Sequence, residues 1–187
     1  MSSGRGNELR VQAPQCAAPF VVHAERPRTL LIGDGVGIGS VVFLAERLRG
    51  SFPAAPAATA AVGYWKPLVL LGSEIPFPFR TRPSTVLVSG IPTGSIACMP
   101  LLEEWGVPSR LASKSDFPGC FDGWVTELAD AWLGSLGPAE LAEVEIFSCG
   151  PTSMLDATGE LARRYAVPCQ SVSVVPPAVD AHTEPRR

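Results

Sequence analysis

Short apolar runs that end in glycine recur along the chain and predict buried strands. The clearest are Thr29–Ile32, Pro67–Leu71 and Val144–Cys149. Continuous apolar runs of this length are typical of strands covered on both faces of a parallel sheet. Weaker runs at Ser109–Ser113 and Gln170–Val175 predict two further strands, and Val86–Val88 predicts a short one.

Between these runs, apolar residues recur with the period of an α-helix. Val41, Leu44, Ala45 and Leu48 share one helical face, Val125–Leu136 repeats the pattern, and Met154–Tyr165 carries a third stripe. Pro151 suits the first position of this last helix, where no amide donor is needed. Ile96–Trp105 predicts a shorter helix. The Ala- and Pro-rich residues 51–63 predict a loop, and the prolines of residues 75–83 exclude a central strand there.

Strands that alternate with helices predict an α/β fold. We expect three layers, with a mostly parallel sheet of about five strands and helices on both of its faces. The polar, aperiodic residues 1–27 predict an N-terminal arm, residues 28–175 the folded domain, and residues 176–187 a C-terminal tail.

Composition excludes several classes of protein. Fifteen basic and eighteen acidic residues among 187 give a net charge of −3, which argues against a nucleic-acid binder. No apolar run is long enough to span a membrane, and the first residues lack the apolar core of a signal peptide. The five cysteines contain no CxxC pair, which argues against a disulfide framework or a metal site. We therefore expect a cytoplasmic protein.

The first candidate site is the glycine-rich turn Gly33–Ser40, between a predicted strand and a predicted helix. Backbone amides in such a turn approach phosphate oxygens, and the helix N-terminus favours negative charge. The spacing is not G-x-G-x-x-G, because Ile38 stands where the last glycine would be. A tight turn without a ligand is the alternative. Because Asp34 would repel a phosphate, we expect its side chain to point away.

Two further turns follow predicted strands at the same edge of the sheet. Cys149–Met154 begins a helix where ligands bind in open α/β sheets. Ser113–Gly123 is a polar loop that is either part of the site or a solvated connection. Cys149 is either a small buried side chain or a nucleophile, and no histidine lies outside the terminal segments to activate it.

Together these motifs resemble a known family. LLIGDGVGIG, LASKSDFPGCFDGWVTEL and FSCGPTSML, in this order, resemble the NAD-binding domain of the ferredoxin–NADP reductase superfamily, and within it the electron-transfer subunit of dihydroorotate dehydrogenase, an enzyme of pyrimidine biosynthesis. The resemblance covers residues from about 19 to 171. It implies that NAD(P)H binds to this chain and exchanges a hydride with a flavin, while the protein positions the two reactants.

The resemblance also implies roles for individual residues. Gly33, Gly35, Val36 and Gly37 would line the pyrophosphate, whereas Cys149, Gly150 and Pro151 would lie beside the nicotinamide with Met154 behind them. Gly72, Ser73, Glu74 and the loop from Ser113 to Asp116 would face the adenosine half. Arg80 and Arg82 are candidates for contact with a 2′-phosphate, so the sequence does not choose between NADH and NADPH.

The sequence also departs from this family. Its members carry a flavin-binding β-barrel and a cysteine cluster that holds a [2Fe–2S] centre. The 27 residues before the first predicted strand are too few for that barrel, and no cysteine follows Cys169. The family implies FAD and a [2Fe–2S] cluster, but this chain lacks the regions that bind them. We therefore expect either that the flavin is held by a flavin-bearing or catalytic partner subunit or that the chain is a fragment. The alternatives are a non-catalytic regulatory or interaction protein that keeps the fold, and an unrelated enzyme with Cys149 as nucleophile.

Overall fold

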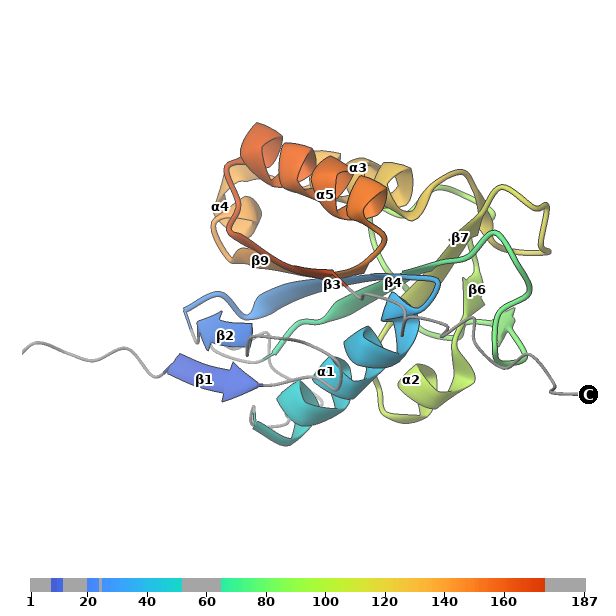
Figure 1. Ribbon diagram of the computed structural model, residues 1–187, viewed down its shortest axis with the longest axis horizontal. Coiled ribbons are helices and arrows are strands. Elements are labelled where there is room, and N and C mark those ends of the chain that lie inside the picture. Colours follow the sequence, from blue (N-terminus) through green and yellow to red (C-terminus); the bar gives the residue numbers. More distant parts are fainter. Residues whose placement is uncertain (1–7, 12–19, 24, 52–64, 174–187) are drawn as a thin grey trace, which may run out of the picture.

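The computed structural model describes residues 8–11, 20–23, 25–51 and 65–173 (Figure 1). The main strands are β3 (Arg28–Asp34), β4 (Leu68–Gly72), β7 (Ser109–Ser113), β8 (Phe121–Asp122), β9 (Val144–Gly150) and β10 (Cys169–Ser173). In the described residues they form one sheet in the order β10–β9–β3–β4–β7–β8, and every neighbouring pair is parallel. The expected sheet had about five strands, and the sixth, β8, has two residues.

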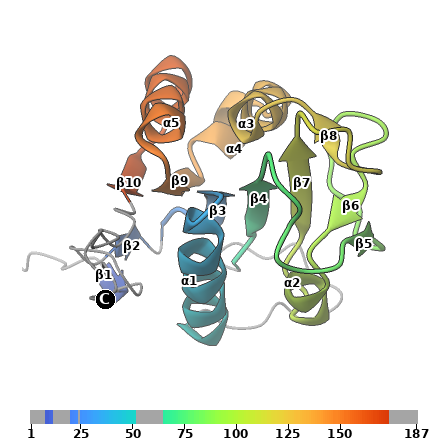
Figure 2. The ribbon, with the colours of Figure 1, turned by 45° about the vertical axis from the view of Figure 1, so that its right-hand side comes forward.

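Helices cover both faces of this sheet, as Figure 2 shows. They are α1 (Gly37–Ser51), α2 (Pro100–Glu104), α3 (Val125–Gly134), α4 (Pro138–Leu141) and α5 (Thr152–Tyr165). Helices α1 and α2 lie on one face, and α3 and α5 lie on the other (Figure 2). The α/β fold in three layers that the sequence predicts is confirmed.

The sheet separates two apolar cores because successive side chains of a strand point to opposite faces. On β3, Leu31 packs with the α1 residues Val41 and Leu44, whereas Leu30 and Ile32 pack with α3 and α5. All three β3 side chains are fully buried. This two-sided burial explains why the strands read as continuous apolar runs in the sequence.

Two strands lie within the segment that was expected to be an arm. β1 (Glu8–Val11) and β2 (Phe20–His23) pair in antiparallel orientation. Phe20 and Val22 are buried in the core on the α1 side, and the Phe20 ring meets Phe147 edge-on with 5.5 Å between centroids. A four-residue strand is too short for periodicity to predict. The division into arm, domain and tail stays a prediction.

A buried carboxylate holds β2 against the sheet. Glu145 on β9 has a fully buried side chain, and its Oε1 lies 2.8 Å from His23 Nδ1 and accepts a hydrogen bond from Gln170 Nε2 at 2.8 Å. The backbone amide of Val21 donates to Gln170 Oε1 at 2.9 Å. Since a buried carboxylate is stable only with polar partners, this network fixes the position of β2.

The predictions for residues 86–105 are wrong in two places. Val86–Val88 forms no strand, because the Val86 carbonyl accepts hydrogen bonds from the side chains of Arg110 and Ser84 instead of a neighbouring strand. The helix predicted over 96–105 is confined to α2. It begins at Pro100, and Ala97–Cys98 before it forms β6, which pairs with β5 (Arg82–Pro83).

Other element boundaries differ by a few residues. Helix α3 ends at Gly134 rather than Leu136, and α4 was not predicted. Pro151 is the N-cap of α5 and not its first helical residue. Strand β10 begins at Cys169, and the predicted end of that strand, residues 174 and 175, lies outside the described residues.

Within the described part of the chain, no helix is both long enough and apolar enough to cross a membrane. The compartment stays a prediction.

The packing of α1 onto β9 generates a first testable prediction. A Cβ at Gly37 would lie 1.9 Å from the carbonyl oxygen of Cys149. Because this neighbour is backbone and cannot rotate away, we expect Gly37→Ala to lower the free energy of unfolding by about 3 kcal/mol or more. Urea denaturation followed by circular dichroism measures the change.

Gly39, two residues further along α1, is the matched control. A Cβ there meets no atom within 4 Å, so Gly39→Ala should raise the free energy of unfolding by roughly 0.5–1 kcal/mol through helix propensity. Equal effects of the two substitutions would contradict the packing described here.

Candidate functional site

Four neighbouring strands of the sheet end at one edge, and each leads into a predicted site segment. β3 leads into the glycine turn and α1, β9 leads into Pro151 and α5, and β4 leads into Ser73 and Glu74. β7, next to β4, leads into the loop after Ser113. The parallel topology therefore brings the three motifs together at the carboxyl edge, where ligands bind in open α/β sheets.

The three glycines that the resemblance places at the pyrophosphate have different structural roles. Gly35 has φ +53°, a left-handed conformation that favours glycine, and nothing lies within 4 Å of the Cβ position there. A Cβ at Gly33 would lie 3.1 Å from a Val41 methyl group, and Gly37 lies against the Cys149 carbonyl. Gly33 and Gly37 thus allow close packing of α1, and Gly35 leaves the backbone of the turn open.

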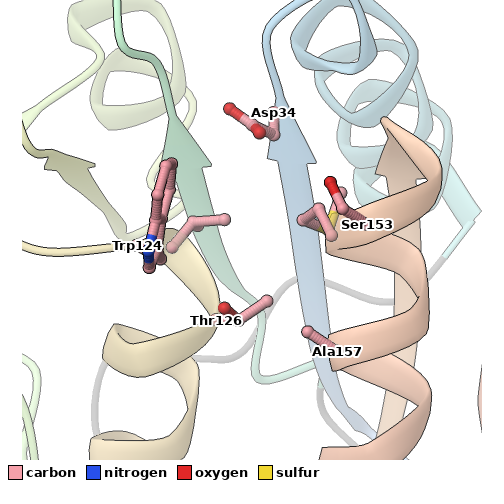
Figure 3. Close-up of a pocket in the computed structure, with 7 residues that line it drawn as sticks. Asp34, Trp124, Thr126, Ser153 and Ala157 are labelled. Carbon is pink, nitrogen blue, oxygen red and sulfur yellow. The ribbon is translucent and has the colours of Figure 1, made fainter.

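A cavity of about 260 Å³ lies at this edge (Figure 3). The residues that line it come from the end of β3, the start of α3 and the start of α5: Asp34, Trp124, Val125, Thr126, Ser153, Met154 and Ala157. Asp34, Ser153 and Met154 belong to segments that the sequence predicts as site segments, whereas Trp124, Val125, Thr126 and Ala157 were not predicted to lie at the site. For the residues contributed by α3, the sequence holds one signal: a tryptophan, Trp124, directly before a predicted amphipathic helix.

Asp34 faces the cavity rather than pointing away from the site (Figure 3). This corrects the expectation from the sequence. The carboxyl group projects over the end of β4, since a Cβ at Gly72 would lie 2.9 Å from Asp34 Oδ1. Burial raises the pKa of Asp34 above its usual 3.8, and the nearby Glu74 raises it further, while the Gly35 amide opposes the rise.

The N-terminal turns of two helices also border the cavity. Thr126 belongs to the first turn of α3 and Ser153 to the first turn of α5. The first amides of a helix have no partner within it, and neither N-cap, Trp124 nor Pro151, provides a side-chain acceptor. The helix dipoles therefore place partial positive charge at a cavity that also contains a carboxyl group.

The segment after β4 and the loop after β7 contact each other. The backbone amide of Lys114 donates to Glu74 Oε1 at 3.2 Å, and Ser115 Oγ donates to the Glu74 carbonyl at 2.7 Å. Ser73 is buried, and its hydroxyl donates to the Ile75 carbonyl. Lys114 Nζ lies 4.9 Å from the centre of the Trp124 ring. These contacts connect the end of β4 to the wall of the cavity.

Three other predicted site residues differ in how far their side chains are buried. Ser113 is buried, and its hydroxyl accepts from the Ser115 amide at 3.1 Å. Asp116 has φ 53° and an exposed side chain. Val36, at the tip of the glycine turn, is 61% exposed. The structure thus brings these residues to the same edge, and their roles toward a nucleotide stay predictions.

Cys149 is fully buried, and its carbonyl contacts the start of α1. Gly150 and Pro151 follow at the edge, and a Cβ at Gly150 would lie 2.5 Å from the terminal methyl of Met154. Met154 therefore packs directly against Gly150. A buried thiol does not favour the alternative of a cysteine nucleophile.

The two arginine candidates lie away from the cavity. Arg82 Nε lies 3.9 Å from Glu103 Oε2, and Arg82 Nη2 donates to the Pro100 carbonyl at 3.5 Å. Arg80 is exposed, and neither residue lines the cavity.

The position of Asp34 predicts a pH-dependent stability. Because the folded chain holds this proton more tightly than the unfolded chain, stability falls as pH rises from about 3.8 through the folded-state pKa. Asp34→Asn removes that loss, so the variant should be more stable than the wild type at pH 7. Urea denaturation measures the difference, and a carboxyl-carbon NMR titration measures the pKa.

Asp156→Asn is the control, because it removes one exposed carboxylate of α5 that does not line the cavity. We expect no comparable gain from it. An Asp34 titration midpoint at or below 3.8 would contradict the burial of this carboxyl group.

The burial of Cys149 predicts how the thiols react. In the native state at pH 7, iodoacetamide should leave Cys149 unmodified while it slowly modifies the partly exposed Cys120. Peptide mass spectrometry after a time course measures this, with urea-unfolded chain as the control in which both react. Rapid native-state modification of Cys149 would support the nucleophile alternative.

The comparisons with known proteins show only a distant likeness. No protein-family model matches the chain, and no curated protein matches it. Among solved structures, the chain is similar to a point mutant of ferredoxin–NADP⁺ reductase from Plasmodium falciparum in complex with 2′P-AMP. The match has 9% identity and a TM-score of 0.38, covers 78% of this chain and spans about half (52%) of the reductase. A likeness this weak carries no argument about ligand or activity.

Proposed function

We propose that this chain binds NAD(P)H across the carboxyl edge of its sheet and positions it for hydride exchange with a flavin. The flavin would be held by a partner, as the resemblance of the three motifs to the electron-transfer subunit of dihydroorotate dehydrogenase suggests. The observation that carries the proposal is the meeting of the glycine turn, the N-termini of α3 and α5 and the cavity beside Asp34 at one edge.

The edge has the features that a pyrophosphate requires. Partial positive charge at helix N-termini attracts phosphate oxygens, and uncapped amides provide donors. At Gly35 the absence of any atom within 4 Å of the Cβ position leaves the backbone open to a ligand. These features support a pyrophosphate beside the turn.

The cavity suits one end of a dinucleotide. Its volume of about 260 Å³ is just below the range of pockets for whole small molecules, about 300–1,000 Å³, so it holds only part of a dinucleotide. The Trp124 ring forms one wall of the cavity. Thr126 of α3 and Ser153 of α5 carry hydroxyl groups on its two sides (Figure 3). An aromatic wall with a few polar groups is typical of sites that take a ring and a sugar.

The chemistry asks little of the protein beyond positioning. Bound NAD(P)H supplies a hydride from the nicotinamide C4, and no side chain has to accept or donate a proton for that transfer. Gly150 and Pro151 would set the position of the ring, with Met154 as the apolar support behind them. Cys149 would act through its backbone, since its thiol is buried.

A flavin-bearing partner would cover the same edge. Val36 is 61% exposed, Ile75 is 71% exposed and Trp124 is 47% exposed, and all three follow strand ends at this edge. Exposed apolar side chains that gather in one place are typical of interaction sites. Among the described residues, no three His, Cys, Asp or Glu side chains gather to hold a metal, so an iron–sulfur centre is proposed for the partner.

A non-catalytic regulatory or interaction protein is the second candidate. The observation that favours it is the pair of carboxyl groups, Asp34 and Glu74, which interact at the edge where a dianionic pyrophosphate would bind. Titration with nucleotide distinguishes the two candidates.

The proposal predicts that the full chain binds NADH or NADPH in isothermal titration calorimetry, and that Ser153→Glu weakens binding at least about tenfold. The new carboxylate would lie at the cavity and repel the dinucleotide. An acidic residue in the first turn of α5 should leave the fold intact or slightly more stable.

Ser153→Gln is the matched control, because it adds nearly the same volume without the charge. It should bind more tightly than Ser153→Glu. Absence of heat with both nucleotides at millimolar concentration in the wild-type chain would overturn the proposed function and favour the non-catalytic candidate.

A further inference from the structure

A leucine projects into solvent beside a second cavity, at the amino edge of the sheet. Leu87 is 97% exposed and stands at the rim of this cavity, which has a volume of about 450 Å³. Apolar side chains from the start of β4, the loop of Leu87, the segment before β7 and the end of α3 contribute to its lining: Leu68, Val88, Pro108, Trp132 and Leu136. A single exposed leucine is ordinary, but here an apolar hollow lies next to it on the same surface.

The loop that carries Leu87 is held in place from two sides. Thr85 Oγ1 donates to Glu103 Oε1 at 2.6 Å, and the backbone amide of Thr85 donates to the same oxygen. On the other side, Arg110 Nη2 donates to the Val86 carbonyl at 2.6 Å. Because the loop is fixed before any contact forms, Leu87 loses little conformational entropy when it binds.

Arg110 holds the loop although its own burial is unfavourable. The residue is buried on β7, and its Nε has no hydrogen-bond partner within the described part of the chain. Burial of a charged group with an unsatisfied donor costs free energy. An apolar residue would satisfy the packing of β7, but it would not hold the Val86 carbonyl. The position of the loop is therefore maintained against a cost.

We propose that this surface, which we call the amino-edge patch, is an interface between two copies of this chain. Leu87 of each copy enters the cavity of the other copy. A projecting side chain and a hollow on the same surface meet the requirement of a two-fold interface, in which each contact occurs twice. The cavity volume lies within the range of pockets that enclose small molecules, about 300–1,000 Å³, so it has room for a leucine side chain.

The charges beside the cavity favour a second copy as the occupant. Arg28 Nη2 lies 2.8 Å from Glu140 Oε1, and Lys66 Nζ lies 3.1 Å from Glu143 Oε2. Bases and acids thus alternate around the patch. A surface with both signs of charge does not repel a copy of itself, whereas a surface of one sign would.

This inference goes beyond the proposed function and does not depend on it. The amino-edge patch lies at the starts of β3 and β4, whereas the candidate nucleotide site lies where these strands end. A dimer formed through the patch would leave both carboxyl edges open.

The experiment is sedimentation-velocity ultracentrifugation of the full chain over a series of micromolar concentrations. We expect the wild type to be in equilibrium between monomer and dimer. Leu87→Ser should raise the dissociation constant of the dimer at least about tenfold, because burial of a leucine side chain favours association by that factor or more. Ile75→Ser is the matched control: it removes an exposed apolar side chain at the carboxyl edge and should leave the constant unchanged.

A second variant tests the cavity itself. Ser89 lines the cavity and is exposed, so Ser89→Phe should fill part of the hollow and weaken self-association as Leu87→Ser does. In a mixture of the two variants, one copy keeps its open cavity and the other keeps Leu87. One of the two contacts can then form, so the mixed pair should associate more tightly than either variant with itself.

The other outcomes overturn the inference. A wild-type chain that stays monomeric throughout the series would overturn it, as would a dimer that Leu87→Ser leaves intact. A dimer lost in Ile75→Ser instead would place the contact at the carboxyl edge. Mixed variants that associate no better than each alone would contradict the two-fold arrangement. Calorimetry with NADH on the same samples keeps this result separate from the proposed function, since Leu87→Ser should bind nucleotide as the wild type does.

Discussion

The structure depends on the close contact between the first residue of α1 and the end of β9. Only a residue without a side chain fits at Gly37, because a Cβ would lie 1.9 Å from the Cys149 carbonyl. This contact brings the start of α1 against the strand that leads into α5, so two helix N-termini lie at one edge of the sheet. The remaining parts of the candidate site, Asp34 and the cavity, lie beside that contact.

The central strands were predictable because burial on both faces leaves a strong signal in the sequence. Arg28–Asp34 contains the apolar run Leu30–Ile32, and Val144–Gly150 is buried throughout although it includes Glu145 and Ser148. Each strand has glycine at or next to its end and leads into a turn. The short elements were not predictable. Phe20–His23 and Ala97–Cys98 depend on contacts with distant residues, such as Phe147 and the loop that contains Gly119, which no local pattern reveals. Helix boundaries shifted where proline fixed them, as at Pro100 and Pro151.

The sequence predicts at which edge of the sheet the candidate site lies, but not which side chains line its cavity. The motifs located the turns, since parallel strands end together. They did not locate the side chains that α3 contributes, because the distance from Trp124 to Asp34 depends on how α3 packs. The orientation of Asp34 was mispredicted for a related reason. The expectation rested on the glycine turn alone. In the structure, Gly72 on β4 leaves the space into which the Asp34 side chain extends.

Amide chemical-shift mapping with NADH tests the central claim most directly, because it reports where on the chain a nucleotide contacts. The account predicts shifts concentrated at Gly35–Gly37, Trp124–Thr126 and Gly150–Met154, at the carboxyl edge. It predicts little change at the opposite edge, where Trp65 and Leu136 line a separate cavity. Shifts confined to that opposite edge, or spread without focus over the chain, would contradict a nucleotide site at the ends of the strands.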